Sequence, residues 1–172
     1  LALVIIGLII YSAIQAYYGI AGNFESKSSY HPHTKPVILG ILICIFIEII
    51  IGTEIRGGLD MSRKENPLIE GVILLKMLGP FKYMHTILGF TLLGLTIYLW
   101  KIVNDIKFIS SSFMVNSVNF IMGLIITQII LGEALVFLEV KPLMQLFHMW
   151  FSSLLVGLSI ASFTFYKISM EK

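Results

Sequence analysis

Two histidines occupy similar places in two long apolar stretches of the chain. His85 lies in residues 80–100, PFKYMHTILGFTLLGLTIYLW, and His148 lies in residues 142–166, PLMQLFHMWFSSLLVGLSIASFTFY. Each stretch opens on a proline, which suits the first turn of a helix because its missing N–H has no partner there. The offsets of the two histidines from their prolines differ by one residue, or about 1.5 Å of helix rise. We therefore expect both imidazoles at nearly the same depth in a membrane.

These residues suggest iron chemistry. A histidine inside a membrane-spanning helix is costly unless its ring is paired, and such residues usually mark functional sites. A neutral imidazole is a good iron ligand, and facing helices provide an apolar slot for a porphyrin. The pair predicts a haem iron bound by His85 and His148. Gly89 and Ser152 follow the histidines by one turn and are small enough to leave clearance for a flat ring. The alternative is that each histidine is an interfacial residue bonded to a loop carbonyl.

The composition places the chain in a bilayer. Hydrophobic residues make up 57% of the 172 residues, charged residues only 13%, and the mean hydropathy is +0.91, which excludes an ordinary soluble domain. The net charge of +2 without a basic patch argues against nucleic acid as a partner. A single cysteine, Cys44, leaves no intrachain disulfide or thiolate cluster. Because the chain opens on the apolar Leu1, we expect a piece of a longer protein that begins inside or just before a helix.

Five apolar segments are long enough to span a bilayer, which takes about 20 helical residues. They are residues 1–20, 36–53, 80–100, 113–138 and 142–166. A shorter apolar stretch, residues 72–78, is expected to lie along the interface or over the mouth of the helices. We predict an all-α integral membrane protein with five transmembrane helices, the last four forming a haem-binding four-helix bundle. Residues 1–22 would form a separate first helix, and residues 36–167 the four-helix bundle.

The cations divide equally between the two membrane faces, so the positive-inside rule does not orient the chain. One face would carry Lys27, Lys35, Lys101, Lys107, Lys167 and Lys172, and the other Arg56, Arg63, Lys64, Lys76, Lys82 and Lys141. The second group shares its face with both histidines. Since haem propionates need cations, we expect Arg56, Lys82 and Lys141 to be near them.

Other polar residues are weaker candidates. Glu48 should lie deep in its helix, as a protonated acid bonded to Gln128 or Thr127 or as part of a proton path. Glu133 and Glu139 are expected in solvent or at the interface, near the face that carries the two membrane histidines. His31 and His33, in YHPHT, could chelate a metal, but their loop is predicted on the opposite face.

Three stretches resemble one family in their order and spacing. They are IGTEIRGGLD, FKYMHTILGFTLLGL and QIILGEALVFLEVKPLMQLFHMWFSSLLVGL. Together they are similar to the C-terminal half of the haem A synthase family of cytochrome oxidase assembly proteins. The resemblance covers roughly residues 36–166, and residues 1–20 resemble the last helix of the preceding half. Its most specific parts are His-x-Ile-Leu-Gly at His85 and Gln-x-x-Leu-Gly before the second histidine helix.

The resemblance implies a function. The family oxidises the C8 methyl of haem O to a formyl group, and its C-terminal half holds a haem b that passes electrons. His85 and His148 would be the axial ligands of haem b, with Arg56, Lys82 and Gly89 beside it. The haem O substrate would bind in the missing half, and the fragment alone would be inactive, with its catalytic residues unknown. Partners would include haem O synthase, oxidase assembly factors and the lipid bilayer, in a prokaryotic plasma membrane with the haem near the extracytoplasmic face.

Some residues depart from the family pattern. Thr86 stands where members often have arginine after the first ligand, so a propionate or loop contact would be either absent or supplied by Arg56 or Lys82. Lys82 stands where the substrate-binding half carries a glutamate, as expected of the cofactor half. Two other functions stay open. One is a b-type membrane cytochrome of a respiratory chain, and the other is a haem-free scaffold or transporter in which the histidines only pack.

Overall fold

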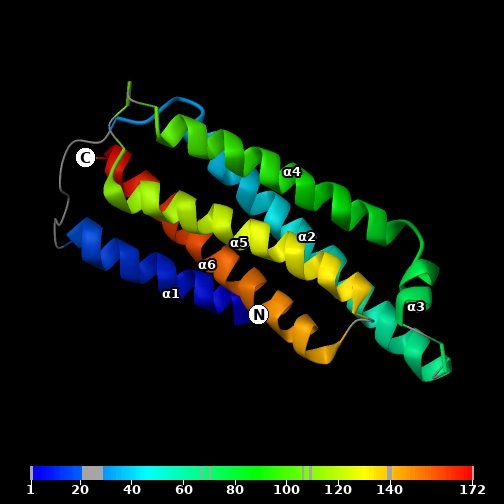
Figure 1. Cartoon of the computed structure of the whole chain (residues 1–172). Helices are drawn as coiled ribbons and strands as arrows, with labels where there is room; N and C mark the ends of the chain where they lie inside the picture. Colours follow the sequence, from blue (N-terminus) through cyan, green and yellow to red (C-terminus); the bar gives the residue numbers. More distant parts are fainter. Residues whose placement is uncertain are drawn as a thin grey trace.

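The computed structural model describes residues 2–20, 29–66, 68–69, 71–105, 107–108, 110–138 and 141–171. The elements are α1 Ala2–Ile14, the π-helical turn η1 Gln15–Ile20, α2 Thr34–Glu65, α3 Gly71–Met77, α4 Pro80–Val103, α5 Ser112–Phe137 and α6 Pro142–Glu171 (Figure 1). Four of them, α2, α4, α5 and α6, are long and apolar enough to cross a membrane. These four confirm four of the predicted spans. The apolar helix Val4–Tyr18 is shorter, so the fifth span stays a prediction.

The long helices alternate in direction. Figure 1 shows α4 and α6 running one way and α2 and α5 running the other. In the packing, α2 contacts α4 and α6, and α5 contacts the same two helices, while α1 lies against α6. This arrangement places α4 and α6, the two histidine helices, diagonally across from each other. The prediction that these two helices run the same way is confirmed.

Helix α2 is longer than its apolar stretch. We predicted a span over residues 36–53 followed by a polar connector, but the helix continues without a break to Glu65. At about 1.5 Å per residue its length is roughly 48 Å, well beyond the roughly 30 Å of a bilayer core. The predicted end was wrong because polarity marks where a helix leaves the membrane, whereas a polar sequence can remain helical in water. Leu59 in this extension is fully buried against Leu74 of α3.

The short helix α3 covers the side of this extension. Leu74 and Leu75 are buried, and Leu78 and Leu135 pack around the contact with α2. Gly79 then takes a left-handed conformation with φ 64°, which glycine adopts without a steric penalty, and Pro80 starts α4 directly after it. The apolar stretch at residues 72–78 therefore packs on the protein at the end where α4 begins.

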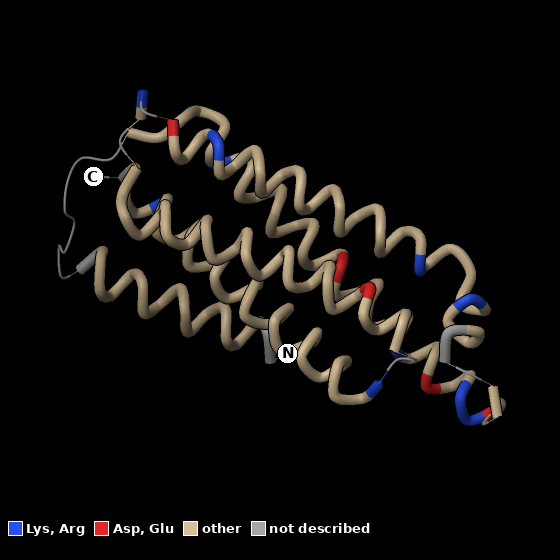
Figure 2. The backbone as a smooth tube through the Cα atoms, in the orientation of Figure 1, with Lys and Arg blue, Asp and Glu red and all other residues tan. Residues whose placement is uncertain are grey.

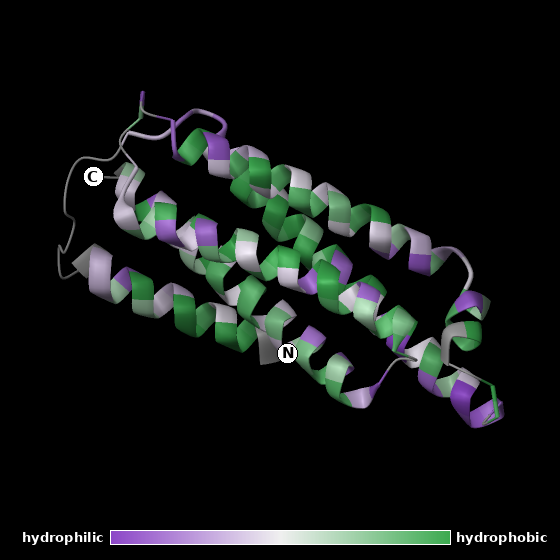
Figure 3. Ribbon diagram, in the orientation of Figure 1, coloured by the Kyte–Doolittle hydropathy of each residue, from purple (hydrophilic) through white to green (hydrophobic). Residues whose placement is uncertain are grey.

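Buried residues concentrate in one half of the long helices. In α4 they begin at Leu92, in α5 they end at Ile125, and in α6 they begin at Leu155. These positions all belong to the half away from the α3 end. Figure 3 shows hydrophobic residues along the helix bodies, and Figure 2 shows charged residues mostly toward the ends. The half next to α3, which carries both membrane histidines, is therefore the less tightly packed one.

Candidate functional site

The two membrane histidines lie close together between α4 and α6. The ring centroids of His85 and His148 are 6.3 Å apart, and their planes are inclined by 63°. Each ring comes from the first two turns of its helix, where the proline start places it. The rings are neighbours, in agreement with the prediction that they share one depth, which itself stays a prediction. The two rings are close enough to act on one small centre between them.

His85 has an acidic neighbour from a third helix. Glu48 Oε2 of α2 contacts His85 Nδ1 in an ion-pair geometry. The Glu48 side chain is 13% exposed and the His85 side chain 31% exposed, so the contact lies mostly inside the protein. The expected partners of Glu48 were wrong, since Thr127 donates to the Gly123 carbonyl and the Gln128 amide group donates to α6. Sequence reasoning placed Glu48 at depth but missed its contact with the histidine.

Three glycines make room for these side chains. A Cβ at Gly52 would lie 3.4 Å from His85 Cε1, and one at Gly132 would lie 3.8 Å from His148 Cε1. A Cβ at Gly89 would lie 3.3 Å from Glu48 Oε1. The clearance expected at Gly89 is therefore next to the carboxyl group. Gly52 and Gly132 are the glycines that face the rings.

The main chain at His148 is fixed by two side chains. Gln128 Nε2 donates a hydrogen bond of 2.8 Å to the His148 carbonyl oxygen, and Ser152 Oγ donates another of 2.8 Å to the same oxygen. The ring itself is less constrained. Its buried Nδ1 has no hydrogen-bond partner among the described residues; His85 Nδ1 has none of ordinary geometry either, but it contacts the Glu48 carboxyl group. The two histidines thus differ, because only His85 has a carboxylate beside its ring.

The predicted propionate partners lie toward the same end of the helices. Arg56 is an exposed residue of α2 whose guanidinium contacts Met149 Sδ, next to His148, and lies 3.9 Å from Asp60. Lys82 is partly buried with its Nζ 5.9 Å from the centroid of the Tyr83 ring. Lys141 is exposed. Of these three cations, Arg56 is the one whose side chain contacts Met149, the residue after His148.

The remaining candidates are placed apart from this site. His33 Nδ1 shares a 2.6 Å hydrogen bond with the Tyr98 hydroxyl, and His31 Nδ1 accepts one of 3.1 Å from the His33 main-chain N–H. The described residues contain no group of three histidine, cysteine or acidic side chains that could hold a metal ion. Glu133 is exposed, as expected. Glu139, Lys27 and Lys172 lie outside the described residues.

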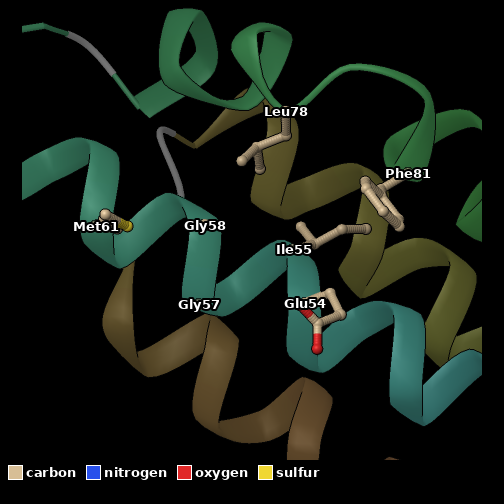
Figure 4. Close-up of a pocket in the computed structure, with 7 residues that line it drawn as sticks. All are labelled: Glu54, Ile55, Gly57, Gly58, Met61, Leu78 and Phe81. Atoms are coloured by element: carbon tan, nitrogen blue, oxygen red, sulfur yellow. The ribbon is translucent and has the colours of Figure 1, made fainter.

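A pocket of about 410 Å³ lies further along α2. Figure 4 shows Leu78 and Phe81 above the α2 turns that carry Glu54, Ile55 and Gly58. The pocket does not include either membrane histidine. It lies between the α2 extension and the α3–α4 turn, outside the space between the two rings.

These features define an integral membrane protein of long apolar helices in which two histidine rings lie close together. Residues 1–160 match the COX15-CtaA family, described as cytochrome oxidase assembly protein, and the chain belongs to this family. The match confirms the resemblance to the haem A synthase family and implies a role in cytochrome oxidase assembly. No curated protein and no solved structure matches the chain.

Proposed function

We propose that this chain provides the haem b site of a haem A synthase-like membrane oxidoreductase, with His85 and His148 as the axial ligands. The observation that carries the proposal is the distance between the two rings. A metal–imidazole bond is about 2 Å long, so two rings that bind one iron from opposite sides have centroids roughly 6 Å apart. The 6.3 Å between the His85 and His148 centroids agrees with this value.

The surroundings of the rings also fit a flat macrocycle. The ligand helices α4 and α6 lie diagonally, as expected of a cofactor held between facing helices of a four-helix bundle. The fully buried residues of α4, α5 and α6 stop short of the histidine end. Side chains there can therefore move apart for a large ligand without the loss of a closely packed core.

The chain's own residues would bind and orient the cofactor. His85 and His148 would supply imidazole nitrogens to the iron. Positive charge at the propionate end would come from Arg56, Lys82 and Lys141. Glycines at three positions leave space beside the rings and the Glu48 carboxyl group: Gly52, Gly89 and Gly132. A haem with two histidine ligands supplies one-electron transfer, and it has no open coordination position for substrate. The function proposed for this stretch is electron transfer.

The reaction of the complete enzyme would be the oxidation of the C8 methyl of haem O to a formyl group. This conversion removes hydrogen and electrons from the methyl carbon and adds oxygen, so the complete enzyme needs an oxygen source and an electron acceptor outside this stretch. The haem proposed here would carry electrons one at a time. Residues 36–167 would form the haem b bundle, and residues 1–22 the last helix of a substrate-binding half that lies elsewhere in the enzyme. We place the haem near the extracytoplasmic face of a prokaryotic plasma membrane, with haem O synthase and oxidase assembly factors as partners.

Visible spectroscopy of the full-length protein tests the ligands. We expect reduced protein to show the sharp α and β bands of low-spin haem b, and His85→Ala and His148→Ala each to abolish them. His33→Ala, at the other end of the helices, is the matched control and should leave the bands unchanged. Unchanged bands in both membrane-histidine variants would refute the site.

Haem extraction from cells tests the reaction. Deletion of the full-length gene should remove haem A and raise haem O, and the gene restored on a plasmid should reverse both changes. Haem A at the level of the parent strain after deletion would refute the synthase function. Low-spin haem in the purified protein would then indicate a b-type electron-transfer cytochrome.

A further inference from the structure

Glu48 contacts the ring of His85, and the proposed function gives this contact no role. Glu48 Oε2 reaches His85 Nδ1 from α2, a helix that supplies neither ligand. Its other oxygen, Oε1, lies over Gly89, where any side chain would come within 3.3 Å. Gly52, one turn after Glu48, leaves space for the His85 ring itself. Two glycines from two helices thus shape the space in which this pair lies.

A carboxyl group at this position in a membrane helix is unfavourable unless it has a polar partner. An acidic side chain in a membrane-spanning helix costs free energy that only a partner can offset. At His85 the contact occupies Nδ1, so Nε2 is the ring nitrogen left free for another ligand. Histidines that bind metals commonly donate their second N–H to a carboxylate or a carbonyl, which fixes the ring and its tautomer.

We propose that Glu48 is a positioning residue for His85: it accepts the Nδ1–H and holds the ring with an unprotonated Nε2 toward the iron. The inference rests on the proposed function, since it assigns a role to a neighbour of a proposed ligand. Glu48 acts through His85 and touches neither the macrocycle nor its substituents in this role. His148 has no carboxyl group in such a contact among the described residues. The buried Nδ1 atoms of both rings lack a hydrogen bond of ordinary geometry there, and the contact with Glu48 is what sets His85 apart.

The two ligands would therefore be electronically unequal. A carboxylate that accepts the Nδ1–H makes the imidazole a stronger donor. A stronger donor favours the ferric over the ferrous iron, and the negative charge of the carboxylate has the same effect. Glu48 would thus lower the reduction potential of the haem through one ligand only.

Two substitutions separate position from charge. Glu48→Ala removes both the acceptor and the charge, while Glu48→Gln keeps an acceptor oxygen of similar reach and removes only the charge. We expect Glu48→Ala to weaken haem b binding by roughly ten- to a hundredfold, the usual cost of losing such a partner. Glu48→Gln should recover most of that affinity. Both variants should raise the reduction potential.

The matched control is Glu54→Gln, which removes the same charge from an exposed position of the same helix. It should leave both the affinity and the potential close to those of the unchanged protein. The measurements are redox titration of the α band and haem titration of the apoprotein in detergent, all on the full-length protein. Glutamine is close in size to glutamate, so the reduction potential of the haem in Glu48→Gln tests the proposal even if Glu48→Ala does not fold.

The outcomes distinguish the inference from the function on which it depends. Low-spin haem in the unchanged protein, with Glu48→Gln at the same potential and Glu48→Ala at the same affinity, overturns the positioning role and leaves the haem site in place. Equal shifts in Glu48→Gln and Glu54→Gln also overturn it, because a general charge effect would then explain both. Absence of low-spin haem from the unchanged protein removes the site and the inference together.

Discussion

The side-chain amide of Gln128 donates a hydrogen bond to the main-chain carbonyl oxygen of His148, over 2.8 Å and between α5 and α6. This bond ties the backbone of a proposed ligand to the neighbouring helix. Gln128→Leu should destabilise the folded protein by about 0.6 kcal/mol, the average for hydrogen bonds between membrane helices, and by no more than the maximum of about 1.7 kcal/mol. Denaturant unfolding in mixed detergent micelles would measure it.

The control for this prediction is Ser152→Ala. It removes the second hydrogen bond to the same oxygen, but that bond runs within α6 and leaves the connection to α5 in place. We expect a smaller loss of stability and no change in haem affinity. A larger effect from Ser152→Ala than from Gln128→Leu would contradict the role given to the interhelical bond.

Bulk at Gly132 should displace the ring of His148. A Cβ there makes ordinary contact with the ring at 3.8 Å, so Gly132→Ala should bind haem nearly normally. The additional methyl groups of Gly132→Val extend further, and crowding of this kind costs about 1 to 3 kcal/mol. If that cost falls on the haem-bound form, affinity drops roughly fivefold to more than a hundredfold. Haem titration would measure the drop.

Gly123→Val is the matched control on the same helix. A Cβ at Gly123 has no atom within 4 Å among the described residues, so the same substitution meets open space. It carries the same change in helix propensity. Equal losses of haem affinity in the two valine variants would show that the effect comes from the helix and not from the ring.

The cations at the histidine end should contribute modestly to haem affinity, and their contribution should decrease in high salt. Lys82→Gln removes a charge from the first turn of α4, beside the proposed propionates. We expect less than a tenfold loss of haem affinity, since accessible ion pairs contribute about 0 to 1 kcal/mol, and a smaller loss in high salt. Lys101→Gln, in the last turn of the same helix, should have no effect on affinity. Haem titrations at low and high salt would compare them, and equal losses would contradict the placement.

The start of α5 depends on Ser111. Its Oγ accepts a hydrogen bond of 3.2 Å from the Met114 main-chain N–H and shares one of 3.3 Å with the Tyr30 hydroxyl. Ser111→Ala should cost about 1 kcal/mol of stability, as is typical for loss of an N-terminal cap. Ser112→Ala, at the next and exposed position, should cost little. Thermal unfolding followed by circular dichroism would show the difference, and equal midpoints in the two variants would contradict the capping role.

The depth of the histidines was predictable because it depends only on position along a helix. The prolines mark the helix starts, and the rise per residue converts the offsets of His85 and His148 into depth. The partner of Glu48 depends instead on how each helix is rotated about its axis, and hydropathy says little about that in a helix apolar on most sides. The sequence offered a usable signal, because Glu48 lies about as far from the end of the predicted span, residues 36–53, as His85 lies from the start of the next one at Pro80.

The glycines and the end of α2 show a second limit. Gly89 was predicted to give clearance at the site, but its actual neighbour, the Glu48 carboxyl group, comes from another helix. The positions of Gly52 and Gly132 beside the rings were not predicted, because only the packed structure shows which glycine faces a ring. The extension of α2 to Glu65 was missed because it is stabilised by Leu59 and Leu74, a contact between separate segments.

The uneven burial along the long helices has a consequence for how this protein matures. Under the proposed function, the closely packed half of the helices would associate before haem binds, and the end around His85 and His148 would gain its remaining contacts from the haem. Synthesis of the chain and cofactor loading would then be separate events.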